Sequence, residues 1–177
     1  THTLNKSVNF LKKKNLLQSI FFCYSRLNCE KYSQSIESVL NNNEERSETI
    51  KFLNSKLLSK PKIYNILKRC NKNKVSLYDL ITKKGIGYHH SGLHNKIKEI
   101  IEILFKMGLI KILFATETFA VGINMPTRTV VFTGLKKPSE EGFRYLLSHE
   151  YKQQAGRAGR LGKDDVGTVI LLNLYNK

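Results

Sequence analysis

Cysteine is scarce in this 177-residue sequence, which contains three. Cys23, Cys29 and Cys70 are odd in number, lie far apart and include no CxxC pair. A small disulfide-stapled fold normally shows an even number of patterned cysteines. The simple interpretation is therefore an intracellular chain with reduced thiols.

Long apolar runs are missing as well. No run approaches the roughly 20 residues that a membrane-spanning helix needs, so we expect no membrane partner. The first residues, Thr1-His2-Thr3, show neither an initiator methionine nor the charged-then-apolar layout of a signal peptide. We therefore expect an excised piece of a longer protein, from which any targeting signal has been removed.

Acidic side chains are few: 14 Asp and Glu stand against 30 Lys and Arg, a net charge of +16. An excess of this size favours a polyanionic partner such as a nucleic acid. A coding bias toward lysine and asparagine that decorates loops is an alternative cause. The hydrophobic content of 41% predicts a folded globule, and the length suits one domain or a fragment of a larger protein.

Short apolar segments alternate with helical patterns along the chain. This alternation predicts an α/β fold in which helices cover both faces of a parallel sheet. Buried strands or strand-and-turn segments are predicted at 19–24, 85–92, 110–115, 129–133 and 167–172. Helices are predicted at 4–15, 29–40, 93–106 and 119–122, with another that is capped by Ser148 and carries Gln153, Arg157 and Arg160. The polar, lysine-rich stretch 41–84 has three apolar stripes typical of a helical insertion, and 134–147 is loop-like.

Two arginines near the C-terminus form the most informative local pattern. Arg157 and Arg160 are three residues apart, a spacing that places side chains on one helix face. Guanidinium groups suit bidentate capture of phosphate oxygens. Gly156 and Gly159 disfavour a helix interior, so close approach to a partner is one interpretation. A helix C-terminus, where glycine caps and cations complement the dipole, is the other.

Polar segments follow three of the predicted strands. They are Ser25-Arg26, His90-Ser91-Gly92 and Thr116-Glu117-Thr118. Ligands of parallel α/β sheets bind outside the carboxyl ends of the strands. We therefore expect these segments to converge on one binding edge.

Other roles for these side chains also have to be weighed. His89, His90 and His94 suggest a metal site, but no cysteine or carboxylate completes a tetrahedral set at the usual spacing, so no metal is expected. Glu117 is either a catalytic base or, as the dipole favours, a carboxylate at a helix start. Thr118 either caps that helix or contacts a phosphate.

Four segments in order resemble the signatures of one helicase class. They are Ser19 to Glu30, Gly87 to Leu93 with its His-His-Ser-Gly block, Phe114 to Pro126, and Gln153 to Arg160 as QxxGRxGR. Together they resemble motifs IV to VI of superfamily-two DExH-box RNA helicases, most closely the superkiller and exosome-cofactor branch. The resemblance implies that 1–177 is the second RecA-like domain, a three-layer α/β/α fold with a mainly parallel sheet and the insertion at 41–84.

The resemblance implies a nucleotide-facing set of residues. ATP and Mg²⁺ would be held mainly by the first RecA-like domain. Arg157 and Arg160 would act as arginine fingers on the γ-phosphate, and Gln153 would hold the same interface. Gly122 and Asn124 would lie toward the nucleotide.

The resemblance also implies a surface for single-stranded RNA. Its contacts would go to phosphate and sugar, with little sequence preference. The residues assigned to it are Ser25, Arg26, His90, Ser91, Gly92, Thr116 and Thr118. The implied partners are RNA, the first RecA-like domain of the same chain and an exosome-associated complex. The implied location is the nucleus, with the cytoplasm as the alternative.

The motifs that would complete this active site are absent. The sequence has neither a GxxxxGK[ST] phosphate loop nor a DExH box. We therefore expect half of an ATP site and no ATPase activity from this chain alone. Two alternatives stay open: a non-catalytic RNA-binding or adaptor module with the same fold, and a DNA helicase of the related repair branch.

Overall fold

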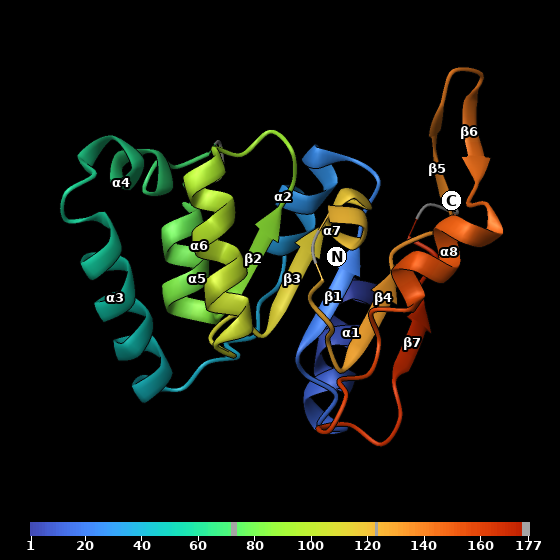
Figure 1. Cartoon of the computed structure of the whole chain (residues 1–177), viewed down its shortest axis with the longest axis horizontal. Helices are drawn as coiled ribbons and strands as arrows, with labels where there is room; N and C mark the ends of the chain where they lie inside the picture. The colour runs from blue at the N-terminus through green and yellow to red at the C-terminus, as the bar shows by residue number, and fades with distance from the viewer. Residues whose placement is uncertain (72–73, 123, 175–177) are drawn as a thin grey trace.

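The computed structural model describes residues 1–71, 74–122 and 124–174. Five strands form one sheet in the order β2-β3-β1-β4-β7, and all neighbouring pairs are parallel (Figure 1). The strands are β1 (Ser19–Phe22), β2 (Ile86–His89), β3 (Ile112–Ala115), β4 (Thr129–Phe132) and β7 (Thr168–Leu171). The helices are α1 (His2–Lys13), α2 (Arg26–Gln34), α3 (Asn43–Leu57), α4 (Pro61–Leu67), α5 (Leu77–Lys84), α6 (Asn95–Lys106), α7 (Thr118–Gly122) and α8 (Ser148–Ala155).

Strand β1 lies at the centre of the sheet, between β3 and β4. All four residues of β1 are buried, as are all four of β3 and of β4. Phe21 pairs in register with Phe114 and Val131, and the rings of Phe21 and Phe114 lie 4.8 Å apart. Strands buried on both faces are nearly continuous apolar runs, which is why these segments show no alternation of polar and apolar residues.

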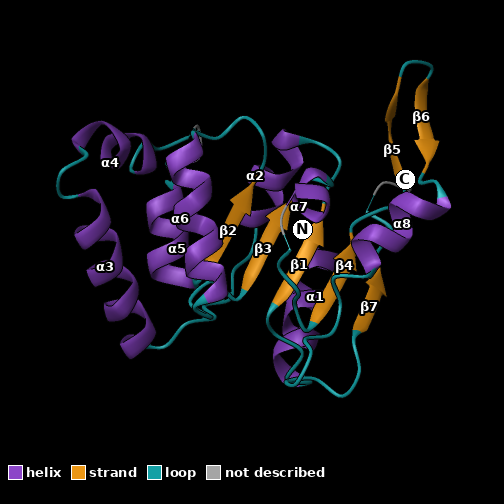
Figure 2. Cartoon of the chain, viewed as in Figure 1, coloured by secondary structure: helices purple, strands orange, loops and turns teal. Residues whose placement is uncertain are grey.

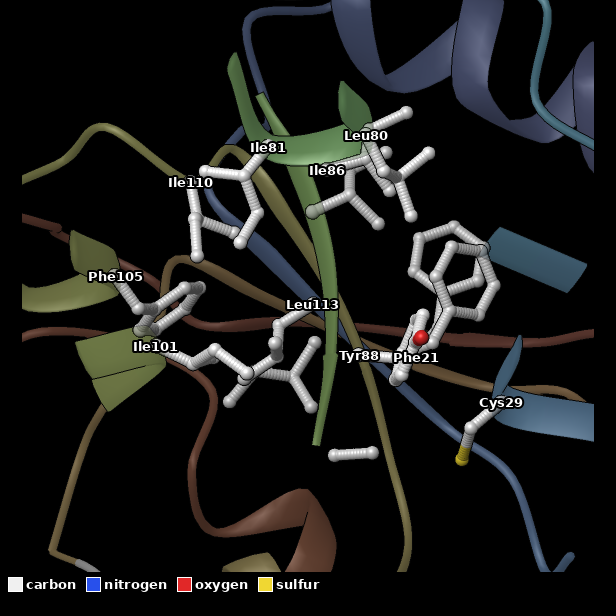
Figure 3. Close-up of a cluster of buried hydrophobic side chains, with 14 of the residues drawn as sticks. Phe21, Cys29, Leu80, Ile81, Ile86, Tyr88, Ile101, Phe105, Ile110 and Leu113 are labelled. Atoms are coloured by element: carbon white, nitrogen blue, oxygen red, sulfur yellow. The ribbon is translucent and has the colours of Figure 1, made fainter. Parts of the chain in front are cut away.

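Helices cover both faces of the sheet around β2. Figure 3 shows Ile101 and Phe105 of α6 on one side of this strand and Leu80 of α5 with Cys29 of α2 on the other. All four side chains belong to the main hydrophobic core. The predicted α/β architecture with a parallel sheet is confirmed.

Three helices, α3, α4 and α5, occupy the stretch 41–84, which was predicted to be a helical insertion. Helix α3 begins with a capping box, in which the Asn42 side chain accepts from the Glu45 N–H and the Glu45 carboxylate accepts from the Asn42 N–H. Helix α5 begins at a Ser76 cap. Gly85, with φ of +71°, ends α5 in the left-handed conformation that glycine adopts without strain.

The segment predicted as a loop at 134–147 contains an antiparallel hairpin. Strands β5 (Lys136–Ser139) and β6 (Gly142–Tyr145) pair with each other and project from the rest of the chain (Figure 2). Most of their side chains are exposed, so the segment has no buried apolar face to mark it as a pair of strands. Only the pairing of the two strands distinguishes this hairpin from a loop.

Three predicted helix starts are wrong, and that of α1 is one of them: this helix begins at His2 rather than at residue 4, and it ends at Lys13 rather than at residue 15. Helix α2 begins at Arg26 rather than Cys29, because the Ser25 hydroxyl caps it by accepting from the Asn28 N–H. Helix α6 begins at Asn95, two residues later than predicted, and the His94 ring caps it by accepting from the Lys96 N–H.

The predicted end of α2 is also too late. The helix stops at Gln34, where the Ser33 and Ser35 hydroxyls donate to backbone carbonyls of the last turn. Such local hydroxyl bonds compete with helix continuation.

Helix α8 does not extend to Arg157 and Arg160, so the prediction that it carries both arginines is wrong. It ends at Ala155, with Gly156 as its C-cap, so Arg157 and Arg160 do not share a helix face. Gly159 has a φ of +89°, which a continuing right-handed helix excludes. At the other end Ser148 is the first helical residue, and Leu147 is the N-cap, whose N–H donates to the Glu150 carboxylate.

Candidate functional site

Three predicted segments meet at the carboxyl edge of neighbouring strands. The register pairs His89 with Ala115 and Ala115 with Phe22, so β2, β3 and β1 end level with one another. The segments after these strands therefore emerge side by side, in the order β2, β3, β1. The strand arrowheads in Figure 1 point to this common edge.

Arg26 and Ser91 join the two outer segments of this edge. The Arg26 Nη2 donates to Ser91 Oγ at 2.7 Å, although β3 lies between their parent strands. Both side chains belong to exposed residues, while Ser25 is committed to capping α2. A Cβ on Gly92 would stand 3.2 Å from Arg26 Nη1, so a glycine there leaves room for the guanidinium.

The His90 ring is held in one orientation. Its Nδ1 accepts from the Gly92 N–H at 3.0 Å, which leaves Nε2 to carry the proton and donate to Glu30 Oε1 at 3.2 Å. His90 is 5% exposed, so its side chain supports the carboxyl edge from below the surface and is not freely accessible to a ligand. Glu30 was not predicted as a site residue.

His89 lies on the other side of the strand end and bonds to α6. Its Nε2 is 2.8 Å from Glu102 Oε1, and its ring meets Phe119 of α7 edge-on. Burial lowers the pKa of His89, while the Glu102 carboxylate opposes that shift. The His89 imidazole thus connects β2 to α6 through Glu102 and to α7 through Phe119.

The segment after β3 turns directly into α7. Thr116 and Thr118 hydroxyls lie 3.0 Å apart, so both threonines predicted to contact phosphate share one small polar cluster. Glu117 pairs with Lys137 at 3.2 Å, and Lys137 also reaches Glu150 of α8. The ion pair gives Glu117 a local structural partner.

Arg157 connects the C-terminal arginine segment to α7. Its Nη1 donates to Asn124 Oδ1 at 3.0 Å and its Nη2 donates to the Ala120 carbonyl. The structure therefore brings together Arg157 and Asn124, and Ala120 lies in the same short helix as Gly122. Nε of Arg157 is buried and finds no hydrogen-bond partner among residues 1–71, 74–122 and 124–174.

Arg160 lies apart from that cluster, in a partly buried ion network that was not predicted. Its Nε and Nη2 donate to the two oxygens of Asp164 at 2.8 and 3.1 Å, and Arg128 Nε donates to the same carboxylate at 2.8 Å. Hydrogen bonds from Arg160, supported by Arg128, hold the pKa of Asp164 well below its usual range. Arg128 immediately precedes β4, so this network lies at the amino edge of the sheet.

A close backbone contact holds the arginine segment in place. Thr127 N–H donates to the Arg157 carbonyl at 2.8 Å, and Gly159 N–H donates to the Thr127 carbonyl at 2.7 Å. Gly167 packs against the same segment: a Cβ there would stand 2.4 Å from the Ala158 carbonyl oxygen. Gly167 is therefore a structural requirement that the sequence did not reveal.

The two adjacent glutamines have different environments. Gln153, the predicted site residue, is exposed. Gln154 is 2% exposed, and its Oε1 accepts from the Tyr24 hydroxyl at 2.8 Å. Gln154 thus ties α8 to the segment after β1, whereas Gln153 is available to a partner.

Asp164 predicts a specific pH dependence of stability. Because its pKa is lower in the folded chain than the ordinary value of about 3.9, its stabilising effect is complete above that value and disappears as the pH falls through and below it. We expect the difference in urea midpoint between the wild type and Asp164→Asn to be large at pH 6 and to shrink at pH 3. The neighbouring exposed Asp165→Asn is the control and should follow the wild type at both values. An equal difference for Asp164→Asn at both pH values would contradict this electrostatic role.

Neither a metal-binding cluster nor a membrane-spanning helix is found among the described residues. Within 1–71, 74–122 and 124–174, no group of three or more His, Cys, Asp or Glu side chains is placed to hold a metal ion. Over the same ranges, no helix combines the length and apolar character needed to cross a membrane.

Comparison with known families decides the relationship. The family of the helicase conserved C-terminal domain matches residues 30–162, which is most of the chain. The chain belongs to this family. The match includes the His90, Thr116 and Arg157 segments, and the predicted membership in the helicases is confirmed.

Several relatives of this helicase domain are named as RNA helicases. It is 43% identical over 170 residues to the antiviral helicase SKI2 of Saccharomyces cerevisiae, an alignment that covers 96% of the chain and 13% of the relative. It is 42% identical over 175 residues to the exosome RNA helicase MTR4 of Homo sapiens, covering 94% and 16%. It is 41% identical over 168 residues to the DExH-box ATP-dependent RNA helicase DExH11 of Arabidopsis thaliana, covering 93% and 12%. The chain thus spans less than a fifth of the length of these relatives.

Proposed function

We propose that this helicase domain is the second RecA-like domain of an ATP-dependent RNA helicase that moves 3′ to 5′ in RNA processing or decay. In this role it supplies arginines to ATP and a phosphate-binding edge to single-stranded RNA. One observation carries the proposal: the segments after β2, β3 and β1 end level and are joined by the 2.7 Å contact between Arg26 and Ser91.

The carboxyl edge suits a nucleic-acid backbone. It offers the Arg26 guanidinium and the hydroxyls of Ser91, Thr116 and Thr118, which are donors of the kinds that bind phosphate and sugar. Arg26 and Ser91 are exposed, and Thr116 and Thr118 lie between their parent segments. The 2′-hydroxyl and phosphates of an RNA strand are the complementary acceptors, so affinity should depend little on base sequence.

The arginine segment suits a nucleotide phosphate. Arg157 has an orphaned buried Nε–H, and Arg160 uses only its Nε and Nη2 in the Asp164 contact. ATP, when bound with Mg²⁺ by a first RecA-like domain, would supply the phosphoryl group whose developing charge these guanidiniums stabilise. Gln153, Gly122 and Asn124 complete the proposed contact with the nucleotide and the first domain. No ATP hydrolysis is expected without that domain.

The proposed partners follow from the same role. They are single-stranded RNA, the first RecA-like domain of the parent protein and an exosome-associated complex, with a nuclear location proposed first. The names of MTR4 and DExH11 as RNA helicases support an RNA helicase over a DNA repair helicase.

Binding of RNA by the 177-residue chain tests the carboxyl edge. We expect Arg26→Ala to weaken the binding of a labelled single-stranded RNA about 5- to 50-fold, the equivalent of one charge-assisted phosphate contact. The slope of log K against log salt should also fall by about 0.7, the value for one lost contact to a single strand. Fluorescence anisotropy at several stated salt concentrations measures both.

Arg69→Ala is the matched control for this experiment. It removes the same charge from an exposed position between α4 and α5 and should reduce affinity and slope much less. Equal losses in the two variants would mean that net charge, and not the carboxyl edge, binds RNA.

A further inference from the structure

The Asp164 carboxylate accepts four hydrogen bonds, three from Arg160 and one from Arg128. Its Oδ2 accepts from the Arg160 backbone N–H at 3.0 Å and from Arg160 Nε at 2.8 Å. Its Oδ1 accepts from Arg160 Nη2 at 3.1 Å and from Arg128 Nε at 2.8 Å. The carboxylate is 4% exposed, so water contributes little to holding it. Asp164 therefore holds Arg160 in place through hydrogen bonds to both its backbone N–H and its side chain.

Asp164 binds only one edge of the Arg160 guanidinium. A guanidinium has two bidentate edges, one formed by Nε with an Nη and one formed by the two Nη atoms. Asp164 occupies the Nε edge. In the described part of the chain no acceptor bonds to Nη1 of Arg160, and the side chain is 19% exposed, so the end-on edge is not used by another residue there.

Arg128 makes the net charge of the network formed by Arg160, Asp164 and Arg128 positive. An aspartate that paired with Arg160 alone would cancel the positive charge that an incoming phosphate needs. Arg128 binds the same carboxylate, and its Nη1 is anchored to the Asn15 carbonyl at 2.7 Å. The three groups carry two positive charges and one negative, so the network as a whole keeps a net charge of +1.

We propose that Asp164 is a positioning residue that holds Arg160 side-on, with Arg128 as its balancing cation, so that the end-on edge of Arg160 is presented to the nucleotide phosphate. This inference rests on the proposed function, because it assigns a geometry to an arginine proposed to face ATP. It assigns no contact with substrate to Asp164 or Arg128 themselves.

A double-mutant cycle in the helicase that carries this chain tests the inference. Arg160→Ala should lower kcat about 10³-fold, as expected for a lost arginine finger. Asp164→Asn should lower kcat about 10²-fold through misplacement, with a much smaller change in KM for RNA. In the Arg160→Ala background Asp164→Asn should change kcat less than 2-fold, because a residue acting through Arg160 has nothing left to position.

The outcomes of the cycle separate the two claims. Arg160→Ala with unchanged kcat would refute the ATP-facing role and, with it, the positioning role. A strong effect of Arg160→Ala combined with an independent, additive effect of Asp164→Asn would overturn the positioning role alone. Asp165→Asn, the adjacent exposed carboxylate, is the matched control and should leave kcat unchanged.

A measurement without catalysis tests the same geometry in the 177-residue chain. The sequence has seven arginines, so their Nε–H signals can be resolved and assigned by NMR. Arg160 Nε–H should exchange slowly with water in the wild type and in Asp165→Asn, and rapidly in Asp164→Asn. Rapid exchange of Arg160 Nε–H in the wild-type chain would overturn the inference even if the Asp164 variant fails to fold.

Discussion

Replacing Arg157 by alanine is expected to lower the ATPase kcat of the helicase that carries this chain by at least about 10³-fold, the range seen for arginine fingers. The side chain is held between the Asn124 amide oxygen and the Ala120 carbonyl, which orients its remaining donors before ATP arrives. Preorganised donors of this kind act on charge that develops in the transition state. Steady-state ATPase assays with saturating RNA measure the effect.

Arg157→Lys separates charge from geometry in the same assay. Lysine keeps the positive charge but loses the planar fork that can bond Asn124 and a phosphate together. Most of the activity should therefore remain lost. Arg69→Ala removes an arginine from an exposed position and should keep wild-type kcat. Recovery of near-normal kcat by the lysine variant would show that charge alone is required.

Replacing Gly167 by alanine is expected to damage both stability and activity. A Cβ at this position would stand 2.4 Å from the Ala158 carbonyl oxygen and 2.8 Å from the Gly159 nitrogen, so the backbone has to move. Overpacking of this kind costs about 1–3 kcal/mol. The displaced segment also carries Arg157 and Arg160, and a shift of about 1 Å in catalytic groups costs about 10²-fold in rate. Urea unfolding of the chain and kcat of the helicase measure the two effects.

Gly162→Ala is the matched control for Gly167→Ala. It changes a glycine in the same loop, where a Cβ meets no atom within 4 Å. Its φ of +76° still makes alanine cost about 1–2 kcal/mol, so the control isolates backbone strain from collision. If the two variants lose kcat equally, the Gly167 contact does not position the arginines.

The sheet and the polar segments at its carboxyl edge were predictable because their causes are local. Strands buried on both faces are nearly continuous apolar runs, which marks β1, β3 and β4 in the sequence even though β1 and β4 begin with Ser19 and Thr129. Parallel strands place their carboxyl ends on one edge, so residues just past those ends had to gather there. The contact between Arg26 and Ser91 is the result.

The hairpin β5–β6 was not predictable on these grounds. Lys136 to Ser139 and Gly142 to Tyr145 expose most of their side chains and therefore carry no burial pattern. Their strands exist because they pair with each other. Pairing of this kind depends on the turn and on the partner strand, not on hydrophobic periodicity.

The sequence by itself determined the order of the helices and of the five strands of the main sheet, the motifs and the type of edge at which polar groups collect. Only the tertiary structure decided how the two arginines are held. Arg157 pairs with Asn124 across 33 residues, and Asp164 pairs with Arg128 across 36. The turn at Gly159 depends on backbone bonds to Thr127. Such contacts join segments distant in the chain, so no local propensity or spacing encodes them, and only the folded sheet brings their partners within reach.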